Sequence, residues 1–242
     1  MDSSSPKKPF RFKQFDIHQD RCAMKVGTDG VLLGAWAPVD KRPASVLDIG
    51  AGTGLIALML AQRTEAETID ALEIDDEAYE QCVENFEASP WADRLFCYHA
   101  GLDEMVEEME EPYDLIVSNP PFHPEQVDSG SEARNKARQN SSLPVEELLL
   151  GVDRLLDPKG IFATIIPYRS EDAIISAALG VNLHLIKATR VKGTPQSPIK
   201  RSLLAFSRSE KILVEEELVI ELERHVYSEA YITLCRDFYL KM

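Results

Sequence analysis

The sequence predicts an α/β fold with a doubly wound, mostly parallel sheet, and three observations support this. From residue 44 onward, short apolar runs alternate with segments whose apolar residues recur at helical spacing, as in parallel sheets covered by helices on both faces. A glycine-rich stretch, 48–54, separates the first apolar run from the first helical segment. A later apolar run, 113–118, ends at Asn119-Pro120-Pro121-Phe122, where the prolines stop the strand.

The first 43 residues are predicted to form a short N-terminal extension, and residues 44–242 the main domain. Residues 10–19 alternate between apolar and polar side chains, which predicts a strand or one arm of a hairpin. The apolar segment 31–37 predicts a helix that ends before Pro38, with Thr28 or Asp29 as its N-cap.

Within the main domain the sequence predicts seven strands, the last two forming an antiparallel pair at one edge of the sheet. The predicted strands are 45–49, 68–74, 94–99, 113–118, 160–167, 181–191 and 201–207. The predicted helices are 55–63, 76–88, 103–111, 144–156, 171–179 and 227–240. The long polar loop 123–142 has a length that is usually functional or mobile.

Length, net charge and cysteine content limit the kinds of protein that this chain can be. A chain of 242 residues is long enough for one large domain with a full core. The net charge of −15 argues against non-specific adhesion to nucleic acid or anionic membranes, although a local basic face remains compatible with it. The four cysteines are scattered without a CxxC pair, so we expect reduced thiols and no metal site. The absence of a long apolar run leads us to expect a cytoplasmic protein without a membrane span, and we expect a monomer.

The stretch Asp48-Ile49-Gly50-Ala51-Gly52-Thr53-Gly54 predicts a nucleoside-binding turn. Its glycines allow a tight turn and a close approach of a ligand to the backbone. Glu73 ends the next predicted strand, where its carboxylate can accept hydrogen bonds from two ribose hydroxyls. Asp48 directly ahead of the turn repels phosphate but suits the cationic methionine end of S-adenosylmethionine. The alternative is a nicotinamide or flavin site, for which GxGxxG spacing is typical.

The corner Asn119-Pro120-Pro121-Phe122 is rigid and rich in hydrogen-bond acceptors. Asn119 offers an amide oxygen, and the prolines keep their carbonyls but lack N–H donors. With an aromatic ring beside it, such a corner can hold a planar group that bears an exocyclic NH2. The alternatives are a plain proline-terminated strand, and Phe122 as a core residue beneath the loop.

These motifs resemble the class I S-adenosylmethionine-dependent methyltransferases, in which the glycine loop, Ala-Leu-Glu-Ile-Asp and Asn-Pro-Pro-Phe stand in this order. The runs 10–15 and 23–36, with 133–138 and 229–231, are similar to one subgroup, the bacterial tRNA1(Val) adenine-37 N6-methyltransferases. The resemblance implies a Rossmann-like domain and an N-terminal segment that folds over the cofactor. It further implies direct methyl transfer to an adenine amine of tRNA.

The resemblance also assigns roles to residues. Asn119 and Pro120 would orient the amine, and Phe122 would stack on the flipped base. The implied cofactor-binding residues are Thr28, Asp29, Asp48, Gly50, Gly52, Gly54, Glu73 and Asn119. This sequence lacks the acid that many relatives carry after the third core strand, so we expect Asp103 or backbone groups to contact the cofactor adenine.

Cations gather in three parts of the chain despite the negative total. No acid occurs between Asp172 and Glu210, whereas six lysines and arginines do, and further cations lie in the N-terminal arm and in the loop after the corner. We expect the groups that contact RNA phosphates to be Lys13, Arg134, Arg138, Lys200 and Arg201. The alternative is a solvated face of mixed charge.

Three other functions are alternatives to this one. A protein glutamine amide presents the same NH2, but the short N-terminal arm does not look like the helical recognition domain of such enzymes. Guanine N2 methylation of ribosomal RNA would predict a duplicated or additional domain. A non-catalytic cofactor-binding scaffold would predict a degraded Asn-Pro-Pro-Phe motif, which is intact here.

Overall fold

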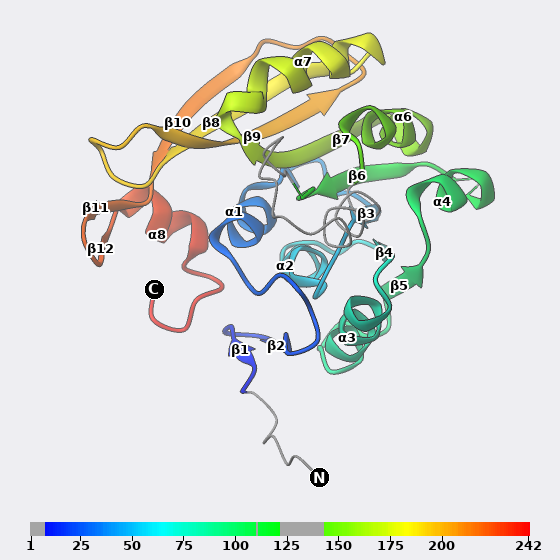
Figure 1. Cartoon of the computed structure of the whole chain (residues 1–242), viewed down its shortest axis with the longest axis horizontal. Coiled ribbons are helices and arrows are strands. Elements are labelled where there is room, and N and C mark those ends of the chain that lie inside the picture. Colours follow the sequence, from blue (N-terminus) through cyan, green and yellow to red (C-terminus); the bar gives the residue numbers. More distant parts are fainter. Residues whose placement is uncertain (1–7, 110, 122–142) are drawn as a thin grey trace, which may run out of the picture.

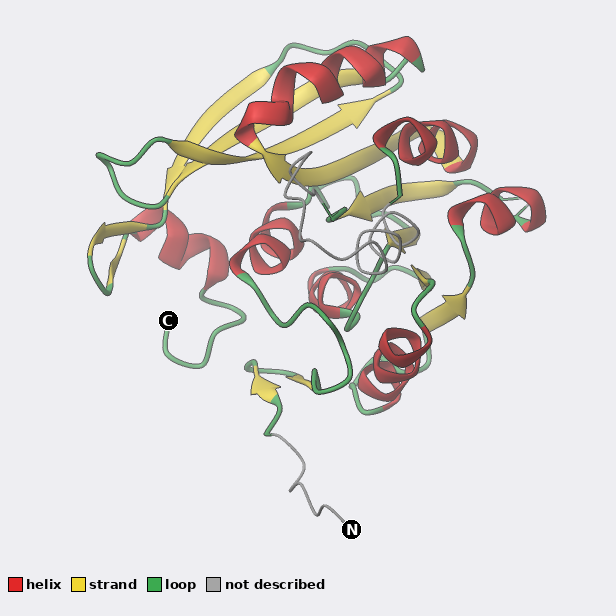
Figure 2. Ribbon diagram, viewed as in Figure 1, coloured by secondary structure: helices red, strands yellow, loops and turns green. Residues whose placement is uncertain are grey.

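The computed structural model describes residues 8–109, 111–121 and 143–242, and its centre is an eight-stranded sheet with helices on both faces (Figures 1 and 2). The strands of this sheet are β3 (Ser45–Ile49), β4 (Thr68–Glu73), β5 (Leu95–His99), β6 (Tyr113–Ser118), β7 (Leu156–Pro167), β8 (His184–Lys192), β9 (Ile199–Ser207) and β10 (Val214–Val219). Their spatial order is β10-β8-β9-β7-β6-β3-β4-β5. The predicted α/β class and mostly parallel sheet are confirmed.

The strand order places a crevice at the middle of the sheet. β3 pairs in parallel with both β4 and β6, so the chain runs outward from β3 to β4 and β5 and then returns to β6. Such a reversal of direction is where open α/β sheets bind ligands, beyond the carboxyl ends of the strands. The register pairs Ile49 with Ser118, which brings the glycine loop and the Asn-Pro-Pro corner to the same place.

Two apolar layers hold the helices on the sheet. α1 (Thr28–Trp36), α2 (Leu55–Arg63), α3 (Asp76–Glu87) and α8 (Glu229–Cys235) cover one face. α4 (Leu102–Glu108), α6 (Val145–Leu155) and α7 (Glu171–Gly180) cover the other. On β3, Val46 joins the first layer while Leu47 and Ile49 join the second. Burial on both faces explains why neighbouring residues of this strand, Val46 and Leu47, are both apolar instead of alternating with polar ones.

The sheet has eight strands, so the prediction of seven was wrong. The additional strand is β10, which lies at the edge and pairs in parallel with β8. Its glutamates meet basic side chains of β8 across the ladder. The ion pairs are Lys187–Glu216 at 3.1 Å, Arg190–Glu215 at 2.9 Å and Lys192–Glu217 at 2.8 Å. Because only Leu218 of β10 is buried, the strand lacks the apolar alternation by which strands are recognised.

The N-terminal segment packs on the C-terminal tail. β1 (Phe10–Arg11) and β2 (Asp16–Ile17) form a small hairpin, in which the rings of Phe12 and Phe15 stack at 4.7 Å. Phe12 bridges to Tyr239, beyond the end of α8. The helix predicted for 227–240 therefore ends earlier, at Cys235, because the tail turns back to meet the hairpin. A second hairpin pairs β11 (Glu221–Glu223) with β12 (Val226–Tyr227).

Helix α1 begins differently from the prediction. Gly27 is its N-cap, and no side chain caps it, so neither Thr28 nor Asp29 has that role. Both lie in the first turn of α1, where Asp29 forms an ion pair with Arg201 of β9 at 2.8 Å. Among the helices that the structure describes, none has both the length and the apolar character of a membrane span.

Candidate active site

A cavity of ≈ 560 Å³ lies beyond the carboxyl ends of β3, β6 and β7. Five segments that are distant in sequence form its wall. These are residues 24–30 before and within α1, the glycine loop with the start of α2, the corner 119–121, the end of β7, and Arg201 of β9. The predicted site residues that line it are Thr28, Asp29, Gly50, Gly52, Asn119, Pro120 and Arg201.

Gly50 and Gly52 leave the cavity open at the backbone. Both have a positive φ, 74° and 57°, and a Cβ added to either would meet no atom within 4 Å. The amides of Gly50 and Ala51 donate to the Leu72 carbonyl at 3.0 and 2.9 Å, which fixes the loop against β4. A ligand can therefore approach this backbone closely, as a nucleoside cofactor requires.

Gly54 has a different environment from the other two glycines. Its φ is 76°, and an added Cβ would lie 2.5 Å from the Phe86 ring and 2.8 Å from Cys82 Sγ on α3. Gly54 does not line the cavity. The structure therefore gives it a packing role between the loop and α3, and its predicted role in cofactor binding stays a prediction.

Glu73 lies beside the glycine loop with both carboxylate oxygens engaged. Oε2 accepts from the Gly52 amide at 2.7 Å, and Oε1 accepts from the Ile74 and Asp75 amides at 2.9 and 3.0 Å. These bonds hold the carboxylate at the end of β4, next to a glycine that lines the cavity. Its contact with ribose hydroxyls stays a prediction.

Asp48 is fully buried beneath the loop, outside the cavity wall. Oδ2 accepts from the Ala57 amide at 3.1 Å, and Oδ1 has no partner among the described residues. Burial raises the pKa of this carboxyl to about 7, and the nearby Glu73 carboxylate adds to the rise. A buried acid with a free acceptor oxygen is suited to a cationic or hydrogen-bonding group, but its contact with the cofactor stays a prediction.

The corner at the end of β6 is tied to β3. The buried Ser118 hydroxyl donates to the Ile49 carbonyl at 2.9 Å, so the two strand ends cannot separate. Asn119 is half-buried and Pro120 is buried, and both line the cavity, as Gly50 and Gly52 do. Phe122, Arg134 and Arg138 lie outside the described residues.

The residues predicted to contact RNA have unequal surroundings. Arg201 Nε donates to Asp29 Oδ2 at 2.8 Å, and Nη1 donates to the Lys200 carbonyl at 3.1 Å. Lys13 Nζ donates to backbone oxygens of the C-terminal tail, at Arg236 and, at 3.1 Å, at Met242. The Lys200 side chain is exposed and has no partner within the described part of the chain.

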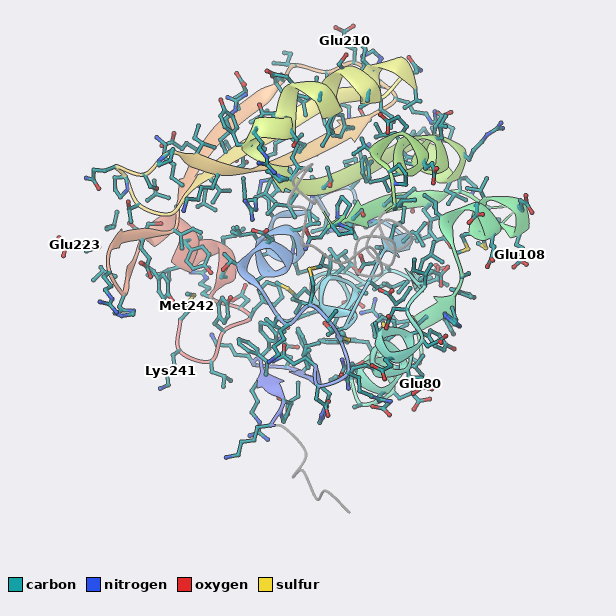
Figure 3. The ribbon with its side chains drawn as sticks, in the orientation of Figure 1. Glu80, Glu108, Glu210, Glu223, Lys241 and Met242 are labelled. Atoms are coloured by element: carbon teal, nitrogen blue, oxygen red, sulfur yellow. The ribbon has the colours of Figure 1, made fainter. Side chains whose placement is uncertain are left out.

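The acid-free stretch 173–209 does not make a free basic face. The β8 cations form pairs with β10, Arg190 also donates to the buried Glu171, and Arg208 pairs with Asp153. No pattern within this stretch indicates the pairing, because the acids belong to other elements. Figure 3 labels four further acids, Glu80, Glu108, Glu210 and Glu223, which project from the periphery.

Sequence reasoning missed part of the cavity wall. Ile165, Ile166 and Pro167 of β7 line it, as do Met24 and Lys25. A signal for the first group existed, because β7 was predicted as a strand of the same parallel sheet, whose strands end at one edge. Asp103, proposed for the cofactor adenine, lies in the first turn of α4 and does not line the cavity.

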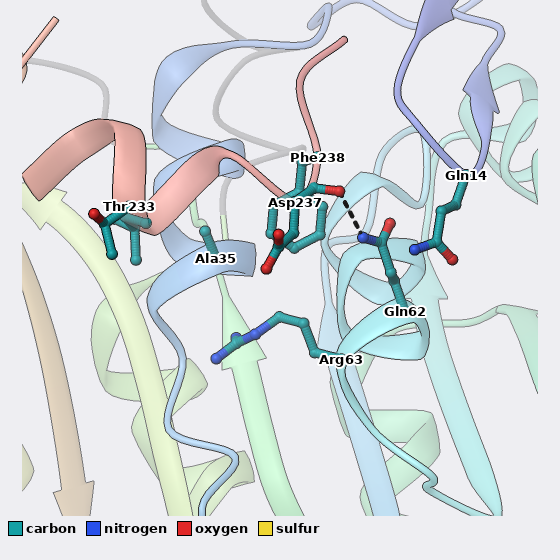
Figure 4. Close-up of a pocket in the computed structure, with 8 residues that line it drawn as sticks. Gln14, Ala35, Gln62, Arg63, Thr233, Asp237 and Phe238 are labelled. Carbon is teal, nitrogen blue, oxygen red and sulfur yellow. Dashed lines mark hydrogen bonds between the residues drawn. The ribbon is translucent and has the colours of Figure 1, made fainter. Parts of the chain in front are cut away.

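A second cavity of ≈ 530 Å³ lies between the N-terminal hairpin, α1, α2 and α8 (Figure 4). Gln62 Nε2 donates to the Asp237 carbonyl across it at 2.8 Å. Arg63 Nη1 donates to the Gly34 carbonyl at 2.8 Å, and burial lowers the pKa of this guanidinium to about 10. None of the predicted site residues that the structure describes lines this cavity.

Known proteins resemble this chain along nearly its whole length. A family model described as Methyltransferase small domain matches residues 31–141. A tRNA1(Val) (adenine(37)-N6)-methyltransferase of Flavobacterium johnsoniae is 62% identical over 234 residues, which cover 96% of this chain and 100% of that protein. The Bacteroides fragilis protein of the same name is 46% identical over 239 residues, 96% of this chain and 98% of its own.

A solved structure supports the fold. The crystal structure of a predicted O-methyltransferase from Agrobacterium tumefaciens has a TM-score of 0.69 at 20% identity, and the match covers 87% of this chain and 96% of that one. The sheet order, the glycine loop and the cavity at the strand ends define a class I methyltransferase with a Rossmann-like domain. Within that class, the chain belongs to the tRNA1(Val) (adenine(37)-N6)-methyltransferase family.

Proposed function

We propose that this protein transfers a methyl group from S-adenosylmethionine to the exocyclic N6 of adenine 37 in tRNA1(Val). The observation that carries the proposal is the placement of Asn119 and Pro120 in the same cavity as Gly50 and Gly52. One cavity thus joins an acceptor-rich corner for a planar amine to an open backbone for a nucleoside. Among the possible target amines, membership of the family favours N6 of adenine 37 in this tRNA.

The residues around the glycine loop fit S-adenosylmethionine. This cofactor supplies an electrophilic methyl group on a sulfonium centre. Gly50 and Gly52 admit a ligand to the backbone, and Glu73 stands at the strand end for the ribose hydroxyls. The buried Asp48 carboxyl can ionise when a cationic group binds beside it. Residues 24–30 cap the cavity, and in this proposal residues 1–43 act as the arm that holds this cap.

The corner orients the target nitrogen. The adenine amine is a poor nucleophile because its lone pair is delocalised into the ring. The Asn119 side-chain oxygen and the Pro120 carbonyl each accept one N–H, which directs the remaining lone pair toward the methyl donor. The N–C bond forms as the donor's S–C bond breaks, and the amine then loses one proton, so no strong base is needed beforehand.

Two further interactions, base stacking and in-line positioning, accelerate the reaction. Stacking of Phe122 on the flipped adenine is worth about 1–3 kcal/mol. In-line positioning of amine and methyl group supplies much of the remaining acceleration.

The protein acts on its tRNA as a cytoplasmic monomer without a metal ion.

Transfer of labelled methyl to total tRNA, followed by nucleoside analysis, tests the proposal. The expected product is N6-methyladenosine, located at position 37 of tRNA1(Val) by fragment mapping. Label in protein alone would assign the corner to a glutamine amide instead. Label in N2-methylguanosine of ribosomal RNA would likewise overturn the proposal.

A further inference from the structure

Two sets of cations in the described part of the chain differ in their partners. Lys187, Arg190 and Lys192 on β8 each lie within 4.0 Å of a glutamate of β10. Arg169 and Lys200 are exposed, and within the described ranges their side chains have neither a hydrogen bond nor a carboxylate partner. A cation without a counter-charge can release condensed counterions from RNA, whereas a paired one must first lose its own partner.

Arg169 and Lys200 each lie within two positions, along the chain, of a residue that lines the cavity. The antiparallel register pairs Pro167, the last residue of β7, with Arg201 near the start of β9, and both of these residues line the cavity. Arg169 belongs to η1 (Tyr168–Ser170), the 3₁₀ turn that follows β7 and contacts β9. Lys200 directly precedes Arg201. The ion pair between Arg201 Nε and Asp29 Oδ2, at 2.8 Å, fixes the start of β9 against α1.

An exposed aromatic ring accompanies these cations. Tyr168 directly follows Pro167 and is 41% exposed. Met24, which lines the same cavity, is 63% exposed. Exposed rings between unpaired cations are typical of surfaces that bind single-stranded nucleic acid, where bases stack and phosphates meet lysine or arginine. An adenine extruded into a pocket leaves its neighbours unstacked and exposed to such a surface.

We propose that Tyr168, Arg169 and Lys200 form an RNA-binding rim beside the active site. Tyr168 stacks on a base next to the target nucleotide, and Arg169 and Lys200 contact the adjoining phosphates. The paired cations of β8 do not contact RNA. This inference rests on the proposed function, because it takes the target to be a nucleotide extruded into the cavity.

Two double variants with the same change in net charge test the cationic part. They are Arg169→Gln/Lys200→Gln at the rim and Lys187→Gln/Lys192→Gln on β8. The measurement is the Kd for tRNA over a series of salt concentrations, with the Kd for S-adenosylmethionine as the control for folding. We expect the rim variant to weaken tRNA binding and to reduce the slope of log K against log salt by about 1.4–1.8. The β8 variant should keep the wild-type slope, and both should keep their affinity for S-adenosylmethionine.

Single substitutions of Tyr168 test the stacking. Tyr168→Ala should raise the Kd for tRNA by about 5- to 150-fold, whereas Tyr168→Phe should bind as the wild type does. Equal losses in the two double variants, or wild-type binding by Tyr168→Ala, would overturn the rim while leaving the proposed function intact. If the wild-type protein methylates no adenine of tRNA in the parallel assay, the proposed function fails, and the rim fails with it.

Discussion

Asn119 supplies the acceptor on which orientation of the target amine depends in the proposed mechanism. Replacing it by alanine removes that oxygen but leaves the glycine loop and Glu73 unchanged. We expect Asn119→Ala to lose at least about 10²-fold in kcat, comparable to the loss of one preorganised hydrogen-bonding group in other enzymes. Affinity for S-adenosylmethionine should survive. Single-turnover methylation and a cofactor titration measure both, and substantial remaining activity would show that another group holds the amine.

Asp48 links the stability of the fold to pH. Burial raises the pKa of its carboxyl to about 7, above the value of about 3.9 expected in the unfolded chain. Between these values the folded state keeps a proton that the unfolded state has lost, so the contribution of Asp48 to stability falls as pH rises toward 7 and is constant above it. Cofactor binding would oppose this by favouring the charged form.

Asp48→Asn should remove this dependence. Relative to the wild type, the variant should gain unfolding free energy between pH 5 and pH 8, on the order of 2 kcal/mol. Urea unfolding of both proteins at several pH values measures the difference, in which the titration of all other groups cancels. A difference that does not change with pH would mean that Asp48 is charged throughout.

Gly52 and Gly54 have similar backbone conformations but different neighbours. An alanine at either position is strained by about 1–2 kcal/mol because φ is positive. At Gly54 the new methyl group would also overlap Phe86 and Cys82, whereas at Gly52 it would enter the open cavity. We therefore expect Gly54→Ala to lower the melting temperature more, and Gly52→Ala to lose more affinity for S-adenosylmethionine. Thermal unfolding and cofactor titration of both variants test this. A larger loss of melting temperature in Gly52→Ala, or a larger loss of cofactor affinity in Gly54→Ala, would contradict this division of roles.

At the scale of elements, burial decides what sequence reasoning can find. The predicted ranges 45–49, 55–63 and 113–118 coincide with β3, α2 and β6, because each of these elements is buried on nearly all sides. β10 was missed because an edge strand needs little apolar surface, and its Glu215-Glu216-Glu217 run reads as a solvated segment. The ends of α1 and α8 depend on Gly27 and on the returning C-terminal tail, which no local pattern reveals.

In the candidate site, too, residues with a local sequence pattern could be predicted, whereas contacts between distant residues could not. Gly50, Gly52, Asn119 and Pro120 have local signatures, and the structure places all four in one cavity. The partner of Arg201 is 172 positions away in the sequence, at Asp29, so no spacing indicates it. The pairing of the β8 cations likewise depends on strand order, because β8 is hydrogen-bonded to β10 on one side and β9 on the other.

The β8–β10 ladder gives a prediction at this scale. We expect Glu215→Gln/Glu216→Gln/Glu217→Gln to lose little stability, about 0.2–1 kcal/mol for each pair, because the side chains are partly exposed. The variant should instead gain affinity for non-specific RNA, since three cations lose their partners on β10. Filter binding to homopolymer RNA at low and high salt measures the gain. Unchanged RNA affinity would show that the ladder does not suppress binding on this surface.

For the whole molecule, the charge distribution restricts where RNA can bind. A net charge of −15 repels a polyanion, so specific contacts must come from places where cations are not paired with acids. We expect affinity for tRNA to fall steeply with salt, which equilibrium titrations at several ionic strengths would measure. Binding that does not depend on salt would exclude phosphate contacts by the cationic groups.

The cavity wall also predicts how a cofactor stabilises the whole fold. Segments from α1, the glycine loop, β6, β7 and β9 all line it, so a ligand there holds together parts of the chain that separate on unfolding. S-adenosylmethionine at 100 times its Kd should add about 2.7 kcal/mol to the unfolding free energy. In a protein of this size that corresponds to a rise of several degrees in melting temperature.

The matched control in that experiment is NAD at the same concentration. Asp48, the acid directly ahead of the glycine loop, disfavours a pyrophosphate and suits a cation, so NAD should give little or no shift. Glu73→Gln should reduce the shift produced by S-adenosylmethionine, because an amide binds ribose hydroxyls less strongly than a carboxylate does. Equal stabilisation by both ligands would indicate that the glycine loop binds a dinucleotide. The corner at Asn119 would then act on a different substrate.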